Sequence, residues 1–147
     1  MRIVIGAPSN GVVLKDELRT FLEADERVEE VLDLSSPDIT YPELSFQAGQ
    51  LILDHQAERG ILICGTGLGT SIAANKVKGI RAATAHDLIS IRGTVENYDA
   101  QILCMGQNVI APVAATALLD VWLDLVHDPA SDYHPKIEEI DAYEHRD

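Results

Sequence analysis

The feature that most limits the possible folds of this chain is a regular alternation of short apolar runs with longer helical patterns. The apolar runs predict strands at 2–6, 28–33, 60–64, 81–85 and 101–105. The helical patterns predict helices at 11–24, 42–57, 68–77, 87–96, 111–127 and 135–143. Strands that alternate with helices form parallel sheets, and runs that are apolar throughout suit strands covered on both faces.

These units predict an α/β fold, a three-layer α/β/α sandwich around a five-stranded parallel sheet. The 147 residues have the usual size of a single domain, and 46% of them are apolar, enough to bury one core. In such sheets ligands bind beyond the carboxyl ends of the strands, where the strand order changes direction. Three loops are expected to meet there: 6–11, 64–71, and the loop after the fourth strand with His86 and Asp87.

The net charge of −13 argues against nucleic acid and anionic membranes as partners. No apolar run reaches the length of about 18 residues that spans a membrane, and the first run is too short for a secretory signal. The two cysteines form no disulfide framework, and the five histidines lack metal-ligand spacing. A cytoplasmic protein without a metal site is therefore predicted.

The stretch ILICGTGLGTSIAANK, residues 61–76, places Cys64 where a buried strand meets a glycine-rich turn and a helix. The bare backbone of Gly65, Gly67 and Gly69 and the helix N-terminus can hold a phosphate or stabilise an oxyanion. A thiol near a helix N-terminus has a lowered pKa and can act as a base or nucleophile. The hydroxyls of this motif belong to Thr66, Thr70 and Ser71.

Three other interpretations of this motif compete with that of an active site. A dinucleotide fingerprint needs G-x-G-x-x-G, but here the third glycine comes one residue early, although Asp87 lies about 20 residues on. The P-loop pattern is absent. A tight turn around an inert core cysteine stays open on spacing alone.

The chain resembles the family of ribose-5-phosphate isomerase type B and galactose-6-phosphate isomerase. The stretches that carry the resemblance are RIVIGAPSNGVVLKDEL, YPELSFQAG, ILICGTGLGTSIAANKVKGIRAA, ILCMGQNVIAP and WLDLVHD. They cover essentially the whole chain. The resemblance implies a Rossmann-like fold and a homodimer or homotetramer with active sites between subunits, and the last helix is expected to pack on a neighbouring subunit.

The resemblance also implies a reaction, the isomerisation of an aldose and a ketose through a cis-enediolate, without a cofactor. Cys64 matches the family's base, and Thr66 the hydroxyl that assists it. The backbone N–H groups of Gly65 to Gly69 match the family's anion hole for the enediolate oxygen.

Three polar sets of the family are altered here. The Asp-His pair of the first loop is replaced by Pro8-Ser9, followed by Asn10, and the His-Asn pair that crosses the subunit interface by Asn97-Tyr98. Because the histidine of that second pair opens the sugar ring, its loss suggests a short or open-chain sugar such as a tetrose. Alternatively, His86 or His134 takes its place.

The third altered set is the arginine pair that holds the phosphate, whose positions fall nearest Tyr133 and Lys136. The phosphate is then held by Lys136, Arg92 and helix N-termini, or the substrate has none. The expected substrate contacts are Ser9, Asn10, Thr70, Ser71 and His134, with Asn97, Tyr98 and Lys136 of a neighbouring chain.

The sequence thus predicts an isomerase of a pentose, tetrose or hexose phosphate. Three alternatives remain: an isomerase of a free sugar, one subunit of a heteromer completed by a paralogous chain, and a non-catalytic module that binds a sugar phosphate or nucleotide.

Overall fold

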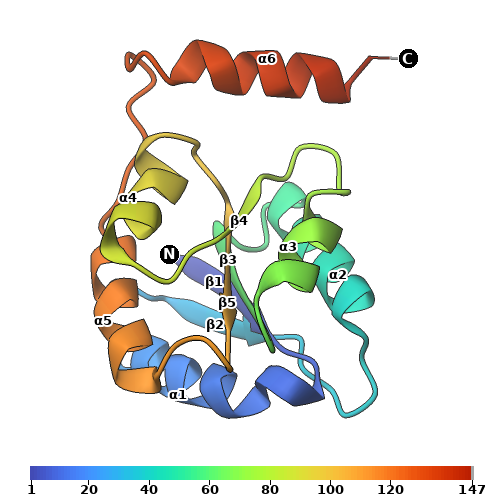
Figure 1. Ribbon diagram of the computed structural model, residues 1–147, viewed down its shortest axis with the longest axis vertical. Helices are drawn as coiled ribbons and strands as arrows, with labels where there is room; N and C mark the ends of the chain where they lie inside the picture. Colours follow the sequence, from blue (N-terminus) through green and yellow to red (C-terminus); the bar gives the residue numbers. More distant parts are fainter. Residues whose placement is uncertain (147) are drawn as a thin grey trace.

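The computed structural model describes residues 1–146 and shows a parallel sheet between two layers of helices (Figure 1). Its strands are β1 (Arg2–Gly6), β2 (Glu30–Asp33), β3 (Arg59–Cys64), β4 (Ala82–Thr84) and β5 (Ile102–Gly106). Its helices are the 3-10 turn η1 (Ser9–Gly11), α1 (Val12–Glu23), α2 (Tyr41–Leu53), α3 (Leu68–Ala74), α4 (Leu88–Glu96), α5 (Pro112–Trp122) and α6 (His134–Glu144).

The described strands follow the order β2-β1-β3-β5-β4, and all neighbours pair in parallel. Helices α1, α4 and α5 cover one face of the sheet, and α2 and α3 cover the other (Figure 1). The predicted three-layer α/β/α fold is therefore confirmed. The strand order changes direction between β1 and β3, so a crevice for ligands is expected at their carboxyl ends.

The apolar strands supply both halves of the core. Ile3, Ile5, Ile61 and Ile63 face the layer of α1, α4 and α5, in which Trp122 is fully buried. Val4 and Leu62 lie between them in the sequence and face α2 and α3. Burial on both faces explains why these strands read as continuous apolar runs.

Three helices end three or more residues earlier than predicted, and one of them, α3, stops at Ala74 rather than residue 77. Helix α2 stops at Leu53 rather than residue 57, and His55 adopts a left-handed conformation with φ of 58°. Helix α5 stops at Trp122 rather than residue 127, because the guanidinium of Arg59 donates to the carbonyls of Trp122 and Leu125. These carbonyls are thus bound by a side chain from β3.

Helix α6 stands apart from the sandwich and crosses one end of the molecule (Figure 1). Its buried anchor is Ile137, while Ile140 and Tyr143 on the same helix are exposed. Asp141 pairs with Arg81 at 3.0 Å, and Glu144 accepts a hydrogen bond from the N–H of Gly79 at 2.8 Å. Among residues 1–146, no helix is long and apolar enough to cross a membrane.

Candidate active site

The candidate site is built around Cys64, the last residue of β3, where the strand ends in the glycine-rich turn. Its side chain is buried, and the residue exposes 6% of its surface. The backbone N–H of Gly67 donates a hydrogen bond to Cys64 Sγ at 3.1 Å, and Thr70 Oγ1 lies 3.7 Å from the same sulfur. The thiol is therefore held at the carboxyl edge of the sheet by groups that can stabilise a thiolate.

These contacts control the protonation of Cys64. Burial is the largest single influence and raises the pKa of the thiol. The backbone N–H groups of Thr70, Thr66 and Gly67, together with the Thr70 hydroxyl, act against burial. Their combined effect is larger, so the pKa of Cys64 lies below the ordinary value of a cysteine.

The turn holds this geometry because it packs closely against β5. Gly67 has φ of 79°, a left-handed conformation that favours glycine, and a Cβ there would lie 2.9 Å from the Met105 carbonyl carbon. The Thr84 hydroxyl donates to the Gly67 carbonyl at 2.7 Å. Gly67 is thus fixed by close packing against β5 and by a hydrogen bond to its carbonyl, while its N–H donates to the thiol.

The hydroxyls of the motif are arranged differently from the prediction. Among the described residues, the hydroxyl next to Cys64 Sγ is that of Thr70. Thr66 Oγ1 instead accepts a hydrogen bond from the N–H of Leu68 at 3.2 Å. Thr70 is fully buried and lies against the thiol, and its expected contact with substrate stays a prediction. Ser71 Oγ donates to the carbonyl of Ala82 at 3.4 Å, which ties it to strand β4.

The first loop directs its two candidate side chains to different places. A Cβ on Gly65 would lie 3.1 Å from Asn10 Nδ2, so this amide lies over the residue that follows Cys64. Ser9 instead lines a hollow of about 470 Å³ together with Val12, Ser35, Ser36 and Pro37. Asn10 therefore faces the glycine turn, and Ser9 faces the loop after β2.

Two residues outside the predicted set also border the glycine turn. Asn108 Nδ2 lies 3.3 Å from the Cβ position of Gly65, and the ring of Tyr41 lies 3.0 Å from that of Gly69. Asn108 follows β5, and Tyr41 begins α2. The sheet topology could have indicated both residues, because the loops after the second and fifth strands must also reach the carboxyl edge of a parallel sheet.

His86, one possible replacement for the lost ring-opening histidine, is held by the backbone. Its Nε2 accepts a hydrogen bond from the N–H of Gly106 at 2.8 Å, which leaves Nδ1 to carry the proton of the neutral ring. Burial lowers the pKa of His86, against a smaller opposing effect of Asp87. The ring is therefore neutral at pH 7 and fixed between β4 and β5.

The loops of the carboxyl edge offer no cation for a phosphate. In the described chain, the segments after the strands contain neither lysine nor arginine: 7–11, 34–40, 65–67, 85–87 and 107–111. Lys15 in α1 is buried and pairs with Asp33 and Asp16, each at 2.7 Å. A phosphate at this edge would therefore need a helix N-terminus or a cation from another chain.

The residues expected from a neighbouring chain gather at the opposite edge of the sheet. The rings of Tyr98 and Tyr133 pack edge to face with centroids 5.9 Å apart, and Lys136 Nζ lies 5.4 Å from the Tyr133 centroid. The Tyr98 carbonyl accepts a hydrogen bond from Arg81, which precedes β4. This amino-edge cluster (Tyr98, Tyr133 and Lys136) and the thiol at the end of β3 are therefore not united within one chain.

His134 and Asn97 belong to the same edge. His134 Nδ1 lies 3.0 Å from His127 Nε2, and His127 Nδ1 lies 2.8 Å from the carbonyl of Glu96, the neighbour of Asn97. Because a carbonyl only accepts, His127 carries its proton on Nδ1, and His134 donates to its Nε2. His134 is thus bonded within its own chain.

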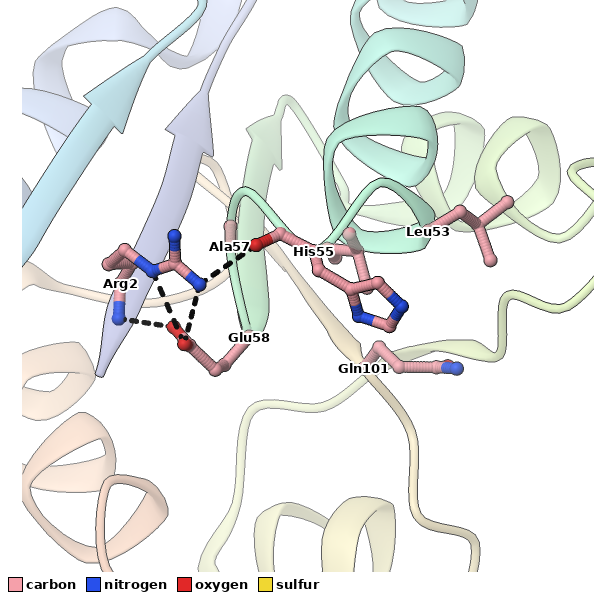
Figure 2. A pocket seen from close by; sticks show the side chains of 7 residues that line it. Arg2, Leu53, His55, Ala57, Glu58 and Gln101 are labelled. Atoms are coloured by element: carbon pink, nitrogen blue, oxygen red, sulfur yellow. Dashed lines mark hydrogen bonds and ion pairs between the residues drawn. The ribbon is translucent and has the colours of Figure 1, made fainter.

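The hollow shown in Figure 2, about 530 Å³ in volume, lies at the amino ends of β1 and β3, away from Cys64. Its arginine, Arg2, bonds to Glu58 and to the carbonyl of His55. Gln101 is bonded at both ends of its amide, to the N–H of Arg81 and the carbonyl of Gly79. These polar groups support the fold, so the thiol site carries the functional argument.

Comparison with known proteins identifies the family of the chain. The model of the Ribose/Galactose Isomerase family matches residues 3–140. D-erythrulose-4-phosphate isomerase 2 of Mycolicibacterium smegmatis is 45% identical over 98% of this chain and 97% of its own length. D-erythrulose-4-phosphate isomerase of Pectobacterium atrosepticum is 35% identical over 100% and 97% of the two chains. The structure of Clostridium thermocellum ribose-5-phosphate isomerase B superposes with a TM-score of 0.91, at 35% identity over 98% and 97% of the two chains.

Proposed function

The chain belongs to the ribose/galactose isomerase family, and we propose that it interconverts an aldose and a ketose of a sugar phosphate with Cys64 as the base. The observation that carries the proposal is the Cys64 thiol with a lowered pKa, at the end of β3 beside the point where the strand order changes. A thiolate there can remove a proton from a carbon next to a carbonyl group.

In the proposed reaction, the thiolate takes the proton from the hydroxyl-bearing carbon of the aldose. The C–H electron pair forms the carbon–carbon double bond, and the carbonyl electron pair moves to oxygen, giving an enediolate. The second oxygen passes its proton to the first and becomes the new carbonyl, while the Cys64 thiol returns its proton to the other carbon. Atoms and electrons balance within the substrate, so the step needs no redox cofactor.

A four-carbon sugar phosphate fits the altered site best. With its terminal hydroxyl bound to phosphate, a four-carbon aldose cannot close a five- or six-membered ring, so no ring-opening histidine is needed. The replacement of the family's histidine by Asn97 and the fixed His86 agree with such a substrate. Two relatives named as D-erythrulose-4-phosphate isomerases support D-erythrulose 4-phosphate as the leading candidate.

A free sugar is the second candidate, because the described loops around Cys64 carry no lysine or arginine. Retention of a phosphorylated substrate requires a cation from elsewhere, and Lys136 of the amino-edge cluster is the proposed source. We propose that a second copy of the chain, in a cytoplasmic homodimer or homotetramer, brings this cluster to the thiol. A paralogous chain could supply the same residues.

The test is proton exchange in D₂O, followed by NMR, with four-, five- and six-carbon sugars, each with and without phosphate. We expect deuterium next to the carbonyl of a phosphorylated four-carbon sugar, and no exchange with Cys64→Ala. Cys104→Ala is the matched control, because burial raises the pKa of this second thiol to about 12 and it should not act as a base.

The remaining outcomes separate the alternatives. Exchange with free sugars alone would show that the substrate is an unphosphorylated sugar rather than a sugar phosphate. Exchange that appears only after a paralogous chain is added would identify a heteromer. Stabilisation by a sugar phosphate without any exchange would identify a binding module and contradict the proposed catalysis.

A further inference from the structure

Two asparagine side chains from different loops converge over the residue that follows Cys64. Asn10 Nδ2 and Asn108 Nδ2 lie 3.1 and 3.3 Å from the position that a Cβ of Gly65 would occupy. Both residues are exposed, and within residues 1–146 their side-chain amides have no hydrogen-bond partner. The absence of a side chain at Gly65 leaves the space in which a small ligand could meet both amides.

The backbones of both residues are anchored to the end of β3. The N–H of Asn108 donates to the carbonyl of Gly65 at 3.0 Å. Gly11, which follows Asn10, packs so closely that a Cβ there would lie 2.7 Å from the carbonyl oxygen of Ile63. The two amides are thus presented from fixed positions, as groups that stabilise a developing charge must be.

The reaction has two anions, the thiolate of Cys64 and the enediolate oxygen of the substrate. The glycine turn alone does not offer enough hydrogen-bond donors for both. Its Gly67 N–H already donates to Cys64 Sγ, so it stabilises the thiolate before proton transfer. When the proton moves to sulfur, the negative charge moves to the substrate oxygen, which then needs donors of its own.

We propose that Asn10 and Asn108 bind the two oxygens of the enediolate, and so act as catalytic residues of the isomerisation. This inference rests on the proposed function. Amide groups donate and accept hydrogen bonds without carrying charge, which suits an oxygen pair whose protons and charge are exchanged during the reaction. The site would therefore select a substrate with a carbonyl and a hydroxyl on adjacent carbons.

The test compares Asn108→Leu, Asn10→Leu and Asn108→Asp with wild type, in kcat, KM and the rate of exchange with D₂O. Removal of one oxyanion donor costs about 10²-fold in kcat, so we expect that loss in each leucine variant, with KM changed by less than about threefold. Asn108→Asp should lose at least as much, because its carboxylate repels the enediolate. In the two leucine variants the rate of Cys64 alkylation by iodoacetamide should stay unchanged, and Gln47→Leu, which removes an exposed amide on α2, should behave as wild type.

Each alternative outcome has a distinct meaning. If wild type turns over and Cys64→Ala does not, but both leucine variants keep kcat within about threefold of wild type, the amide proposal is wrong and the function stands. A rise in KM with unchanged kcat would show that the amides bind the substrate and the transition state equally well, and would also overturn the amide proposal. If wild type exchanges no proton with any sugar, the proposed function itself fails.

Discussion

At the scale of single residues, the two cysteines show that position decides the chemistry of a thiol. Cys104 lies in β5 and is fully buried, and burial raises its pKa to about 12 although the Thr70 hydroxyl acts in the opposite direction. Cys64 is also buried, but three backbone N–H groups bring its pKa below the ordinary value. The apolar runs around both cysteines look alike in sequence, and the turn after Cys64 makes the difference.

Thr70→Val should raise the pKa of Cys64, because the substitution removes a hydroxyl that stabilises the thiolate. Since the thiolate is the proposed base, activity falls as the pH drops through this pKa. The variant should therefore lose activity relative to wild type at pH values below its raised pKa and approach wild type above it.

The pKa of Cys64 can be followed by thiolate absorbance or by the pH dependence of alkylation. Thr94→Val is the control, since this threonine is also buried but bonds to the carbonyl of Ile91. An unchanged titration of Cys64 in Thr70→Val would contradict the role given to this hydroxyl.

Gly67→Ala should both destabilise the protein and remove activity. A left-handed conformation costs a residue with a Cβ about 1–2 kcal/mol, and the close approach to Met105 adds to this cost. Gly93→Ala in α4 is the matched control, because the nearest atom to its Cβ is 3.6 Å away and alanine favours a helix. Urea unfolding and turnover should show a loss for the first variant and none for the second.

At the scale of elements, strand positions follow from the sequence better than helix ends. Strand β1 matches its predicted bounds, and β3 and β5 differ by a single residue at their ends. Strands covered on both faces leave a run of apolar residues that local pattern detects. The ends of α2 and α5 depend instead on His55 in a left-handed conformation and on Arg59 from β3. Neither a left-handed residue that is not glycine nor a contact with a distant strand leaves a mark in the local pattern.

The link between α1 and β2 depends on a buried ion pair, Lys15 with Asp33. Asp33→Asn removes a charge-assisted hydrogen bond and leaves the buried Lys15 with only the exposed carboxylate of Asp16, so it should lower the free energy of unfolding by about 2 kcal/mol. Glu23→Gln, which removes an exposed partner of Arg19, should cost no more than about 0.5 kcal/mol. Equilibrium unfolding in urea at pH 7 measures both.

The ion pair of Lys15 and Asp33 also determines how the stability of the protein changes with pH. The pKa of Asp33 is influenced most by burial, which raises it, but Lys15 and Ser35 together lower it below the ordinary value. Its stabilising contribution is therefore present above the ordinary pKa of an aspartate and is lost as the pH falls through the lowered value. The stability difference between wild type and Asp33→Asn should shrink on acidification, and a constant difference would contradict this account.

At the scale of the whole molecule, the predicted site residues lie at two opposite edges of the sheet. The thiol at the glycine turn could be predicted from one local stretch, because the strand, the turn and the helix N-terminus are consecutive in sequence, but the contact of the thiol with Thr70 depends on how the turn folds. The position of Asn108 beside Asn10 could be predicted only with knowledge of the order of the strands. The proposed approach of Tyr98 and Lys136 to Cys64 requires a second chain, which no local pattern of residues describes.

Mixing two inactive variants tests this division directly. In a symmetric dimer of Cys64→Ala and Lys136→Ala chains, one site has both defects and the other is intact. If half of the dimers are mixed, about one quarter of the wild-type rate should return after the two variants are unfolded and refolded together. Cys64→Ala mixed with Asn108→Leu is the control, because both defects lie at the carboxyl edge of the same chain and every site keeps one of them. Recovery in the first mixture alone would place Lys136 of one chain at the thiol of another. Equal rates in both mixtures, or full activity of Lys136→Ala by itself, would show that the amino-edge cluster serves the fold rather than the reaction.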